Sequence, residues 1–382
     1  MTDVARPAGA DAFDHPVASR TPLGTPRVAA LDITRAIALV GVVVMNYHGY
    51  LNGDTNRTGA LDRLFDIDSG ILSTRFAAVF VLIAGVSVSL LTNTSRTSGD
   101  SSAIRHDRVR LVRRGLILLV AGVALEHAWS GTIIFYYGVY LVIAAWIFTV
   151  SRRWLIALGA TTLIATTTIH VWESVRNSAG HSTAWLHPQH PNDPREWLLR
   201  AAYDHTHPLL PWLGFLCAGM VIGRELVGFT AHARRIAERS MGVVIALYVV
   251  SALLDGLDAR RSDVVHTITS MRPFSGGLFY SASTLAIAIA VFAAVTLLCE
   301  NNNVVRAVSA LQRAGQMTLS LYLLHVVVYY AATTWTTAVT PGLANAVLLA
   351  LSFWAVALAA AAWWHHRIGR GPAEWLYRRL GG

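Results

Sequence analysis

Ten apolar segments recur along this chain of 382 residues, and several approach or exceed the roughly 20 residues that cross the hydrocarbon core of a bilayer. Only 14% of the residues are charged, whereas charged residues make up about 25% of a soluble domain. The sequence therefore predicts an all-α fold, a polytopic membrane helix bundle of about ten transmembrane helices. The predicted helices cover residues 28–50, 71–93, 111–127, 132–150, 154–172, 209–227, 241–256, 277–299, 316–337 and 343–364.

The basic residues are all arginine, and their distribution predicts the orientation of the bundle. Of the 31 arginines, 21 lie in segments on one side of the predicted membrane and 8 lie in loops on the other. Because cytoplasmic loops of membrane proteins are rich in Lys and Arg, we predict that both termini are cytoplasmic. The same rule accounts for the net charge of +9 without a nucleic-acid partner.

The N-terminal residues differ in composition from the rest of the chain. Residues 1–26 contain four prolines and no apolar stretch of signal-peptide type, which predicts a disordered cytoplasmic leader and not a cleaved signal. Residues 27–382 read as a single transmembrane domain. Cys217 and Cys299 lie in or beside apolar segments and are too few for a disulfide framework or a thiolate metal site.

The first apolar segment carries polar residues at both ends. Asp32 and Arg35 are three residues apart, so they share a helix face and can neutralise each other. An ion pair that fixes the helix is the favoured interpretation of these two, ahead of direct catalysis. Asn46 closes the apolar run, and Arg75 lies near the start of the next one. Since charged and polar groups at membrane depth mark interior positions, all four are candidate substrate contacts.

The segment 316–337 has a polar face. Thr318, Tyr322, His325 and Tyr329 are spaced four, three and four residues apart, so they line one side of a helix. A buried His325 needs partners. It either makes a structural hydrogen bond, for example with Tyr322, or takes part in substrate binding or proton transfer. Tyr322 on the same face is a further candidate substrate contact.

His48 lies at the predicted outer end of the first helix. Imidazole suits general base catalysis because its ordinary pKa is near neutral. Asp66 or Asp68 in the following loop is close enough in sequence to orient it. The alternative is an interfacial histidine that contacts lipid headgroups.

The longest predicted outer loop, residues 173–208, holds five histidines. His205 and His207 would bind a metal if the segment were strand-like. We interpret the loop as solvated, and no metal site is predicted.

Six segments form a characteristic succession along the chain. They are 27–46 (RVAALDITRAIALVGVVVMN), 80–89 (FVLIAGVSVS), 131–138 (GTIIFYYG), 210–224 (LPWLGFLCAGMVIGR), 314–325 (AGQMTLSLYLLH) and 371–379 (GPAEWLYRR). In this order they resemble two related membrane families, the DUF418 proteins and the catalytic domain of heparan-alpha-glucosaminide N-acetyltransferase. The segments 314–325 and 371–379 are particularly DUF418-like, and the resemblance covers nearly all of the membrane region.

The resemblance implies a transmembrane acyltransferase domain over residues 27–382, with a DUF418-like C-terminal half, in a bacterial inner membrane. It implies acyl-CoA, with acetyl-CoA as the first candidate, as cosubstrate and no tightly bound cofactor. The acceptor would be an extracytoplasmic glycan, glycolipid or related small molecule, and membrane lipids would surround the protein. No oligomeric state is predicted. The catalytic candidates are His48, His325, Asp66 and Asp68.

In the acetyltransferase family a histidine further into the connecting loop is implicated. This chain has no histidine between residues 49 and 105, so His48 is the nearby substitute. Cytoplasmic arginines could bind the CoA phosphates, although membrane orientation alone would explain them. These candidates are Arg105, Arg108, Arg110, Arg113 and Arg114. The alternative functions are a transporter or lipid flippase, with the polar face of 316–337 lining the path, and a non-catalytic membrane protein.

Overall fold

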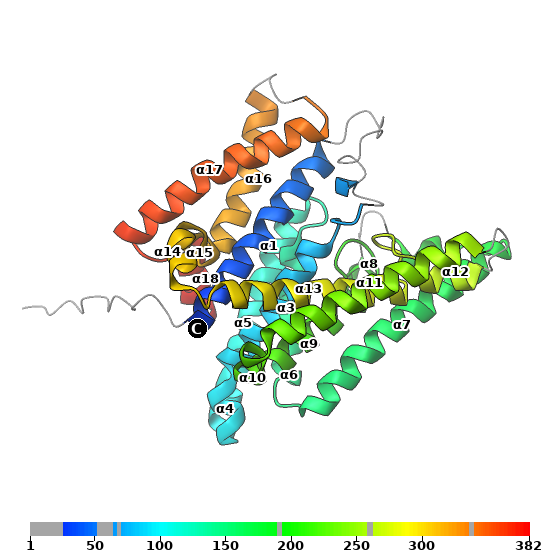
Figure 1. Cartoon of the computed structure of the whole chain (residues 1–382), viewed down its shortest axis with the longest axis horizontal. Coiled ribbons are helices and arrows are strands. Elements are labelled where there is room, and N and C mark those ends of the chain that lie inside the picture. Colours follow the sequence, from blue (N-terminus) through cyan, green and yellow to red (C-terminus); the bar gives the residue numbers. More distant parts are fainter. Residues whose placement is uncertain (1–25, 52–63, 67–69, 189–192, 258–262, 336–339) are drawn as a thin grey trace, which may run out of the picture.

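The computed structural model describes residues 26–51, 64–66, 70–188, 193–257, 263–335 and 340–382, and these ranges contain helices and no strand, which confirms the all-α prediction (Figure 1). The predicted leader lies outside the described residues, except for Pro26. A helix occurs at each of the ten predicted positions. They are α1 (Pro26–Tyr50), α3 (Arg75–Leu91), α5 (Ser101–Glu126), α6 (Ile133–Ile147), α7 (Arg152–Ser178), α9 (Leu209–Arg224), α11 (Ala233–Leu257), α13 (Leu278–Leu298), α16 (Thr318–Trp335) and α17 (Leu343–Arg367).

The number of candidate membrane spans is smaller than ten by length and composition. Helices α1, α7, α11, α13 and α17 are long and apolar enough to cross a membrane. The short helix α15 (Ser309–Gly315) and α16 form a sixth span if they are counted together, although they are bent by 87°. Helices α3, α6 and α9 have only 17, 15 and 16 residues, fewer than the roughly 20 that span a bilayer alone. The chain is thus a multi-pass membrane protein with five or six candidate spans among its described residues, and its orientation stays a prediction.

The short apolar helices are held inside the bundle by close backbone contacts. Helices α3 and α9 pack on each other, and a Cβ atom added to Gly85 would lie 2.1 Å from the carbonyl oxygen of Leu216. A Cβ added to Gly219 would lie 1.9 Å from the carbonyl oxygen of Leu82. Small residues at such crossings let two helices approach closely in a membrane protein.

Some helices continue beyond their apolar segments. Helix α5 begins ten residues before the predicted start at Leu111, because the Asp100 carboxylate accepts hydrogen bonds from the amides of Ser102 (3.0 Å) and Ala103 (3.3 Å) and caps it. Arginines predicted to lie in a loop therefore lie on α5. Helix α7 likewise extends to Ser178.

Shorter elements connect or cover the long helices in the part of the chain that the structure describes, and three of them bear on the site: α8 before α9, the bent helix α15 and the last helix α18. They are α4 (Asn93–Ser98), the 3₁₀ turn η1 (Ala184–Leu186), α8 (Pro194–Ala202), α10 (Leu226–Ala231), α12 (Asp263–Thr269), α14 (Asn302–Ala307), α15 and α18 (Pro372–Gly381).

Asp32 and Arg35 stabilise the bend between α15 and α16. The Asp32 carboxylate accepts hydrogen bonds from the Gln316 side-chain amide (2.8 Å) and from Arg35 (3.3 Å). Gly315 lies against α1 so closely that an added Cβ would be 1.8 Å from the Asp32 carbonyl oxygen. The ion pair that fixes the helix, the favoured interpretation of these residues, is thus present in the fold.

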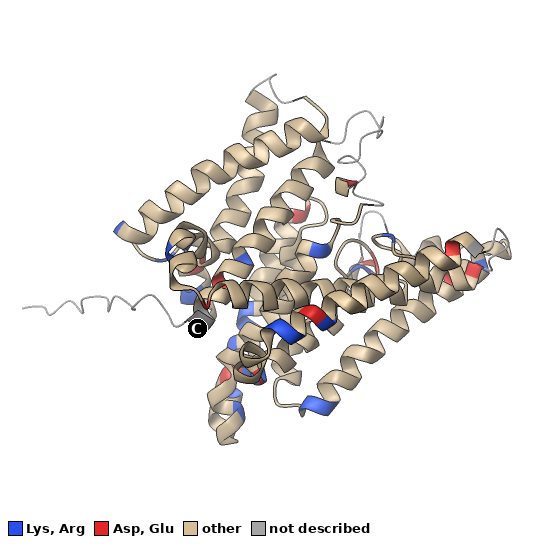
Figure 2. Cartoon of the chain, viewed as in Figure 1, with Lys and Arg blue, Asp and Glu red and all other residues tan. Residues whose placement is uncertain are grey.

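Helix α18 closes the same region by capping α16. The Glu374 carboxylate accepts hydrogen bonds from the backbone amides of Leu319 (2.6 Å) and Ser320 (3.1 Å), which are unpaired donors in the first turn of a helix. In Figure 1, α1, α16 and α17 lie together in the upper part of the molecule, and α7, α11 and α12 extend to the right. The middle of α16 and α17 carries no charged residue, as Figure 2 shows.

Candidate functional site

A cavity of about 240 Å³, called cavity A here, opens beside the C-terminal end of α1. Its α1 wall consists of Val42, Met45, Asn46, Gly49 and Tyr50. Hydroxyl and imidazole groups from four other segments face it between aromatic walls. The other polar lining residues are Ser73, Thr74, Ser130, Thr206, His207 and Tyr322, and the other aromatic ones are Phe76, Trp129 and Phe274.

A second cavity of about 220 Å³, cavity B, lies further toward the N-terminal end of α1, beside Leu39. It is mostly apolar, and α18 contributes Glu374 and Tyr377 to its wall. The two cavities share three lining residues, which we call the septum: Val42, Ile133 and Tyr322. Two chambers of different polarity are thus stacked along α1 with one thin wall between them.

The Tyr322 side chain of α16 holds the septum against the start of α6. Its hydroxyl oxygen accepts a hydrogen bond from the Ile133 amide (3.3 Å) and lies 3.1 Å from the Thr132 hydroxyl oxygen. This bond connects α16 to the turn between α5 and α6, which also lines cavity A.

His325 lies one layer behind the wall of cavity A and is completely buried. Its Nδ1 atom contacts the backbone oxygen of Tyr322, one turn earlier, and its Nε2 atom lies 3.2 Å from the Asn46 amide nitrogen. Nδ1 therefore carries the proton, and Nε2 accepts from Asn46 with its lone pair. The Tyr47 hydroxyl donates to the His325 backbone oxygen (2.9 Å). Because Asn46 itself lines cavity A, it connects Nε2 to the cavity.

The short turn between α5 and α6 is held by a buried ion pair. The Glu126 carboxylate accepts hydrogen bonds from the amides of Gly131 (2.8 Å) and Thr132 (3.3 Å) and pairs with Arg200 of α8. The Arg200 side chain is 3% exposed and that of Glu126 is 10% exposed. This pair positions Ser130 and Gly131 in the wall of cavity A.

Replacing Glu126 by Ala is expected to lower the free energy of unfolding by about 3–5 kcal/mol, because it leaves a buried guanidinium without its counter-ion. Thermal unfolding of the detergent-purified protein measures the loss. The matched control is Glu225→Ala, which breaks a pair with Arg152 whose side chains are 56% and 60% exposed. That exposed pair should contribute at most about 1 kcal/mol. Equal losses in the two variants would contradict the positioning role.

His207 is the histidine that lines cavity A directly. Its Nδ1 atom lies 2.8 Å from the Thr206 hydroxyl oxygen, and its ring packs edge-on against Trp212 at 4.6 Å between centroids. Burial lowers the pKa of His207 to about 3, so the ring is neutral near pH 7. The segment that holds it is irregular and not strand-like, with His205 at φ +74°.

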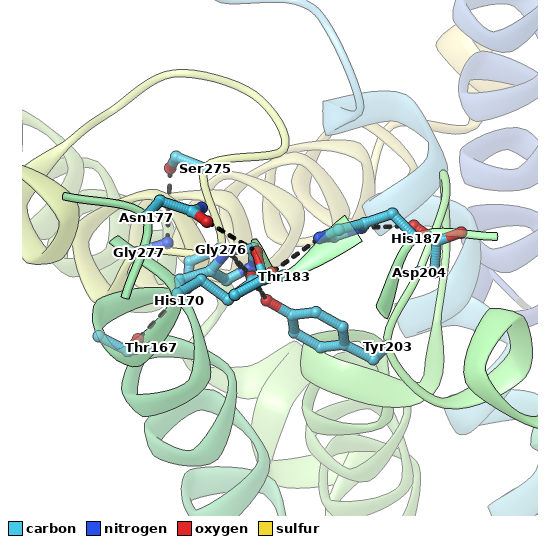
Figure 3. Close-up of polar contacts among 11 residues, drawn as sticks. Thr167, His170, Asn177, Thr183, His187, Tyr203, Asp204, Ser275, Gly276 and Gly277 are labelled. Atoms are coloured by element: carbon cyan, nitrogen blue, oxygen red, sulfur yellow. Dashed lines mark hydrogen bonds and ion pairs between the residues drawn. The ribbon is translucent and has the colours of Figure 1, made fainter. Parts of the chain in front are cut away.

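The predicted solvated loop 173–208 is in fact partly buried, which corrects the sequence interpretation. Figure 3 shows His187 pointing toward Asp204. The His187 ring lies 2.8 Å from Asp204 through Nδ1 and 2.8 Å from Glu173 through Nε2. His187 donates hydrogen bonds to Asp204 and to Glu173, which raise the pKa of His187 to about 10, so it is an imidazolium between two carboxylates. Tyr203 also donates to Glu173.

The charge on His187 makes the stability of this loop pH-dependent. A histidine whose pKa rises from 6.5 to about 10 on folding contributes stability that is complete below about pH 6.5 and disappears as the pH rises through about 10. We expect the difference in Tm between the wild type and His187→Gln to be largest near pH 6 and to shrink toward pH 10. His181→Gln, at an exposed position of the same loop, is the control. A difference independent of pH would contradict the charged bridge.

The structure places only some predicted site residues at the cavities. Asn46 and Tyr322 line cavity A, and His325 lies behind it. His48 lines neither cavity, since it follows Asn46 by two residues at about 100° per residue and so points to another face of α1.

The remaining substrate-contact and carboxylate candidates lie elsewhere. Asp66 is buried but lines neither cavity, and Asp68 lies outside the described residues. Arg75 is buried against α13 and α11, where its guanidinium lies 4.8 Å from the centre of the Tyr280 ring and 3.4 Å from the Tyr248 hydroxyl.

The five candidate arginines of α5 separate onto different faces. Arg108 donates to the Ala145 backbone oxygen (3.0 Å) on α6, and Arg105 and Arg113 are exposed. Arg110 and Arg114 face α18, where both donate to the Gly382 backbone oxygen (2.8 and 2.6 Å).

Helix α18 and the residues before it add basic groups at the same place. Arg378 lies within electrostatic range of Arg35, Arg110 and Arg370, and Arg114 lies over the Tyr377 ring at 5.6 Å. Since Tyr377 also lines cavity B, the arginine cluster lies next to that cavity. We define the cluster as Arg35, Arg110, Arg114, Arg370 and Arg378.

The fold and its two cavities define a multi-pass membrane protein with an enclosed polar site between its helices. Residues 27–252, more than half of the chain, match the family described as "Heparan-alpha-glucosaminide N-acetyltransferase, catalytic", so the chain belongs to that family, and this indicates a membrane acyltransferase. Residues 227–381 match the family described as "Protein of unknown function (DUF418)". The predicted resemblance to both is confirmed. No curated protein matches the chain.

Proposed function

We propose that this protein transfers an acyl group from cytoplasmic acyl-CoA, with acetyl-CoA as the first candidate, to a hydroxyl or amine of an extracytoplasmic acceptor. The acceptor class is a glycan, glycolipid or related molecule of a bacterial envelope, reached from the far side of the inner membrane. The observation that carries the proposal is the pair of cavities on opposite sides of the septum. A donor on one side of the membrane and an acceptor on the other side each need an entrance, and their reacting groups must meet at one point between the two.

Cavity B suits the donor. Its apolar wall would take the acyl end of the pantetheine arm, and the arginine cluster beside it would bind the CoA phosphates, because guanidinium groups pair with phosphate in bidentate geometry. The cluster differs from the set predicted from sequence. Arg110 and Arg114 remain in it, and Arg370 and Arg378 come from the C-terminal region.

Cavity A suits the acceptor. Its hydroxyl and amide groups can bind a polyhydroxylated molecule, and Asn46 connects it to His325. When the acceptor displaces the Asn46 amide, His325 Nε2 becomes the base. The acceptor O–H or N–H proton passes to Nε2, and the acceptor oxygen or nitrogen attacks the thioester carbonyl. The carbon–sulfur bond then breaks, and CoA leaves as the thiol after its sulfur takes the proton from Nε2. Tyr322 in the septum would donate a hydrogen bond to the carbonyl oxygen as it becomes negative.

The test uses purified protein in nanodiscs with radiolabelled acetyl-CoA and glucosamine as model acceptor, since the family name refers to a glucosaminide. We expect saturable acetyl-CoA binding and release of free thiol that increases when glucosamine is added. Absence of both binding and turnover would overturn the proposal. If proteoliposomes then moved a labelled solute without chemical change, the stacked cavities would be a transport path, as the alternative interpretation of α16 predicts.

A further inference from the structure

Phe274 lies where cavity A meets the surface. It lines both cavity A and a more open hollow of about 290 Å³, the vestibule, whose other lining residues include His170, His266 and Arg272. Cavity A and the vestibule share this one residue. The Phe274 ring therefore lies between the vestibule and cavity A.

The backbone at Phe274 is in an unusual conformation. Its φ angle is +60°, in the left-handed region, which costs a bulky residue of the order of 1–3 kcal/mol and persists only where the surroundings enforce it. Its side chain is also 42% exposed, so core packing does not explain why a large ring is held there. A strained, half-exposed aromatic residue at the mouth of a cavity points to a role at that mouth.

The surroundings that enforce this conformation belong to α7. The Thr167 hydroxyl donates to the Gly276 backbone oxygen (3.3 Å), and the His170 ring packs so tightly against Gly276 that an added Cβ would lie 1.8 Å from it. Gly276 itself has φ +60°. The segment 272–277 is therefore fixed from one side by two residues of one helix.

His170 is in turn fixed by the network around His187. Its Nδ1 atom lies 3.1 Å from the Tyr203 hydroxyl, which donates to the Glu173 carboxylate. Figure 3 shows the contact of His187 with Asp204 and, beside it, the Tyr203 hydroxyl near His170, with Gly276 bonded to Thr167. Two segments connect this network to cavity A, the one that carries Phe274 and the one that carries His207.

We propose that Phe274 is a selectivity residue that admits molecules to cavity A according to their size, and that the His170–Gly276 contact holds it in place. The inference rests on the proposed function only in identifying the admitted molecule as the acyl acceptor. Cavity A, at about 240 Å³, is below the roughly 300 Å³ of the smallest typical ligand pockets. Only the reacting end of an acceptor fits, and Phe274 limits the size of the part that enters.

The experiment measures access and requires no turnover. Ser73 lines cavity A and is 2% exposed, and Ser130 lines the same cavity at an exposed position. Each is changed to Cys in full-length protein whose buried Cys217 and Cys299 have been replaced by Ala. Labelling rates are measured with a small methanethiosulfonate reagent and with a bulky biotin maleimide.

We expect Ser73→Cys to react with the small reagent and hardly with the bulky one. Because transient open states are populated at roughly 0.1–10%, Phe274→Ala should raise bulky labelling at position 73 by at least about tenfold. Labelling of Ser130→Cys should not change, and Phe274→Tyr should keep position 73 protected. Gly276→Ala, which leaves the ring but displaces its support, should also open the site.

Equal bulky labelling at position 73 with Phe and with Ala at position 274 would overturn the proposal. An increase at both reporter positions would do the same, since it would indicate general loosening. A failure of acetyl-CoA turnover leaves these rates unaffected, so the two proposals can fail separately.

Discussion

His325→Gln is expected to lower the rate of acyl transfer by about 10²–10⁴-fold, the usual contribution of a general base. The glutamine oxygen can accept the Asn46 hydrogen bond that Nε2 now accepts (3.2 Å), but it cannot take a proton at neutral pH. Since His325 does not line cavity B, the affinity for acetyl-CoA should change little. The measurement is single-turnover transfer from acetyl-CoA to glucosamine, with thermal unfolding to show that the fold persists.

Two other histidines serve as controls for this result. His207→Gln removes the imidazole that lines cavity A directly, and His48→Gln removes the other histidine that the sequence analysis named as a catalytic candidate. We expect each to retain transfer within about tenfold of the wild type, because the proposed proton acceptor is the His325 ring and a lost base costs more than this. Loss of transfer in His207→Gln with normal activity in His325→Gln would move the base to His207. Loss in His48→Gln alone would restore the sequence-based assignment.

The polar face of α16 could be predicted from the sequence because it depends on local helix geometry. Spacings of four, three and four residues place Thr318, Tyr322, His325 and Tyr329 on one side, and the structure buries the last three. The interior position of Asn46 could be predicted as well, because a polar group that ends an apolar run has few alternatives to an interior position.

The direction in which side chains leave α1 near its C-terminal end explains why His48 does not line cavity A. His48 and Asn46 are close in sequence, but residues two apart on a helix do not face the same side. The α1 positions that line cavity A are separated by three and four residues, at Val42, Met45, Asn46 and Gly49. A stricter use of helical periodicity would have separated the two residues without a structure.

Other site residues depend on contacts that no local pattern reveals. Glu126 and Arg200 are 74 residues apart, and nothing near Arg200 in the sequence distinguishes it from the exposed arginines of other loops. His207 precedes α9 and Phe274 precedes α13. The two residues line the same cavity only because the fold brings these two segments together. The predicted number of spans exceeds the five or six candidates for a related reason. An apolar segment can be a helix that is buried between other helices, as α3, α6 and α9 are, and such a helix can be shorter than a bilayer.

The arginine cluster gives the second large effect. We expect the double variant Arg114→Gln with Arg378→Gln to raise the KM for acetyl-CoA by at least about 100-fold, because a hydrogen bond to a charged group contributes about 1.5–3 kcal/mol and each 1.4 kcal/mol is tenfold. The rate at saturating acetyl-CoA should change little, since the cluster lies beside cavity B, away from His325.

A truncated donor isolates the phosphate contacts. S-acetylpantetheine carries the same thioester on the same arm but no phosphate, so its KM should be high and equal in the wild type and in the double variant. The matched control, Arg105→Gln with Arg113→Gln, removes two exposed arginines of the same helix and should leave the KM for acetyl-CoA unchanged. If the double variant at positions 114 and 378 weakened both donors equally, it would have disturbed the wall of cavity B through Tyr377. If the control pair alone mattered, the phosphates would bind on the exposed face of α5, as the sequence first suggested.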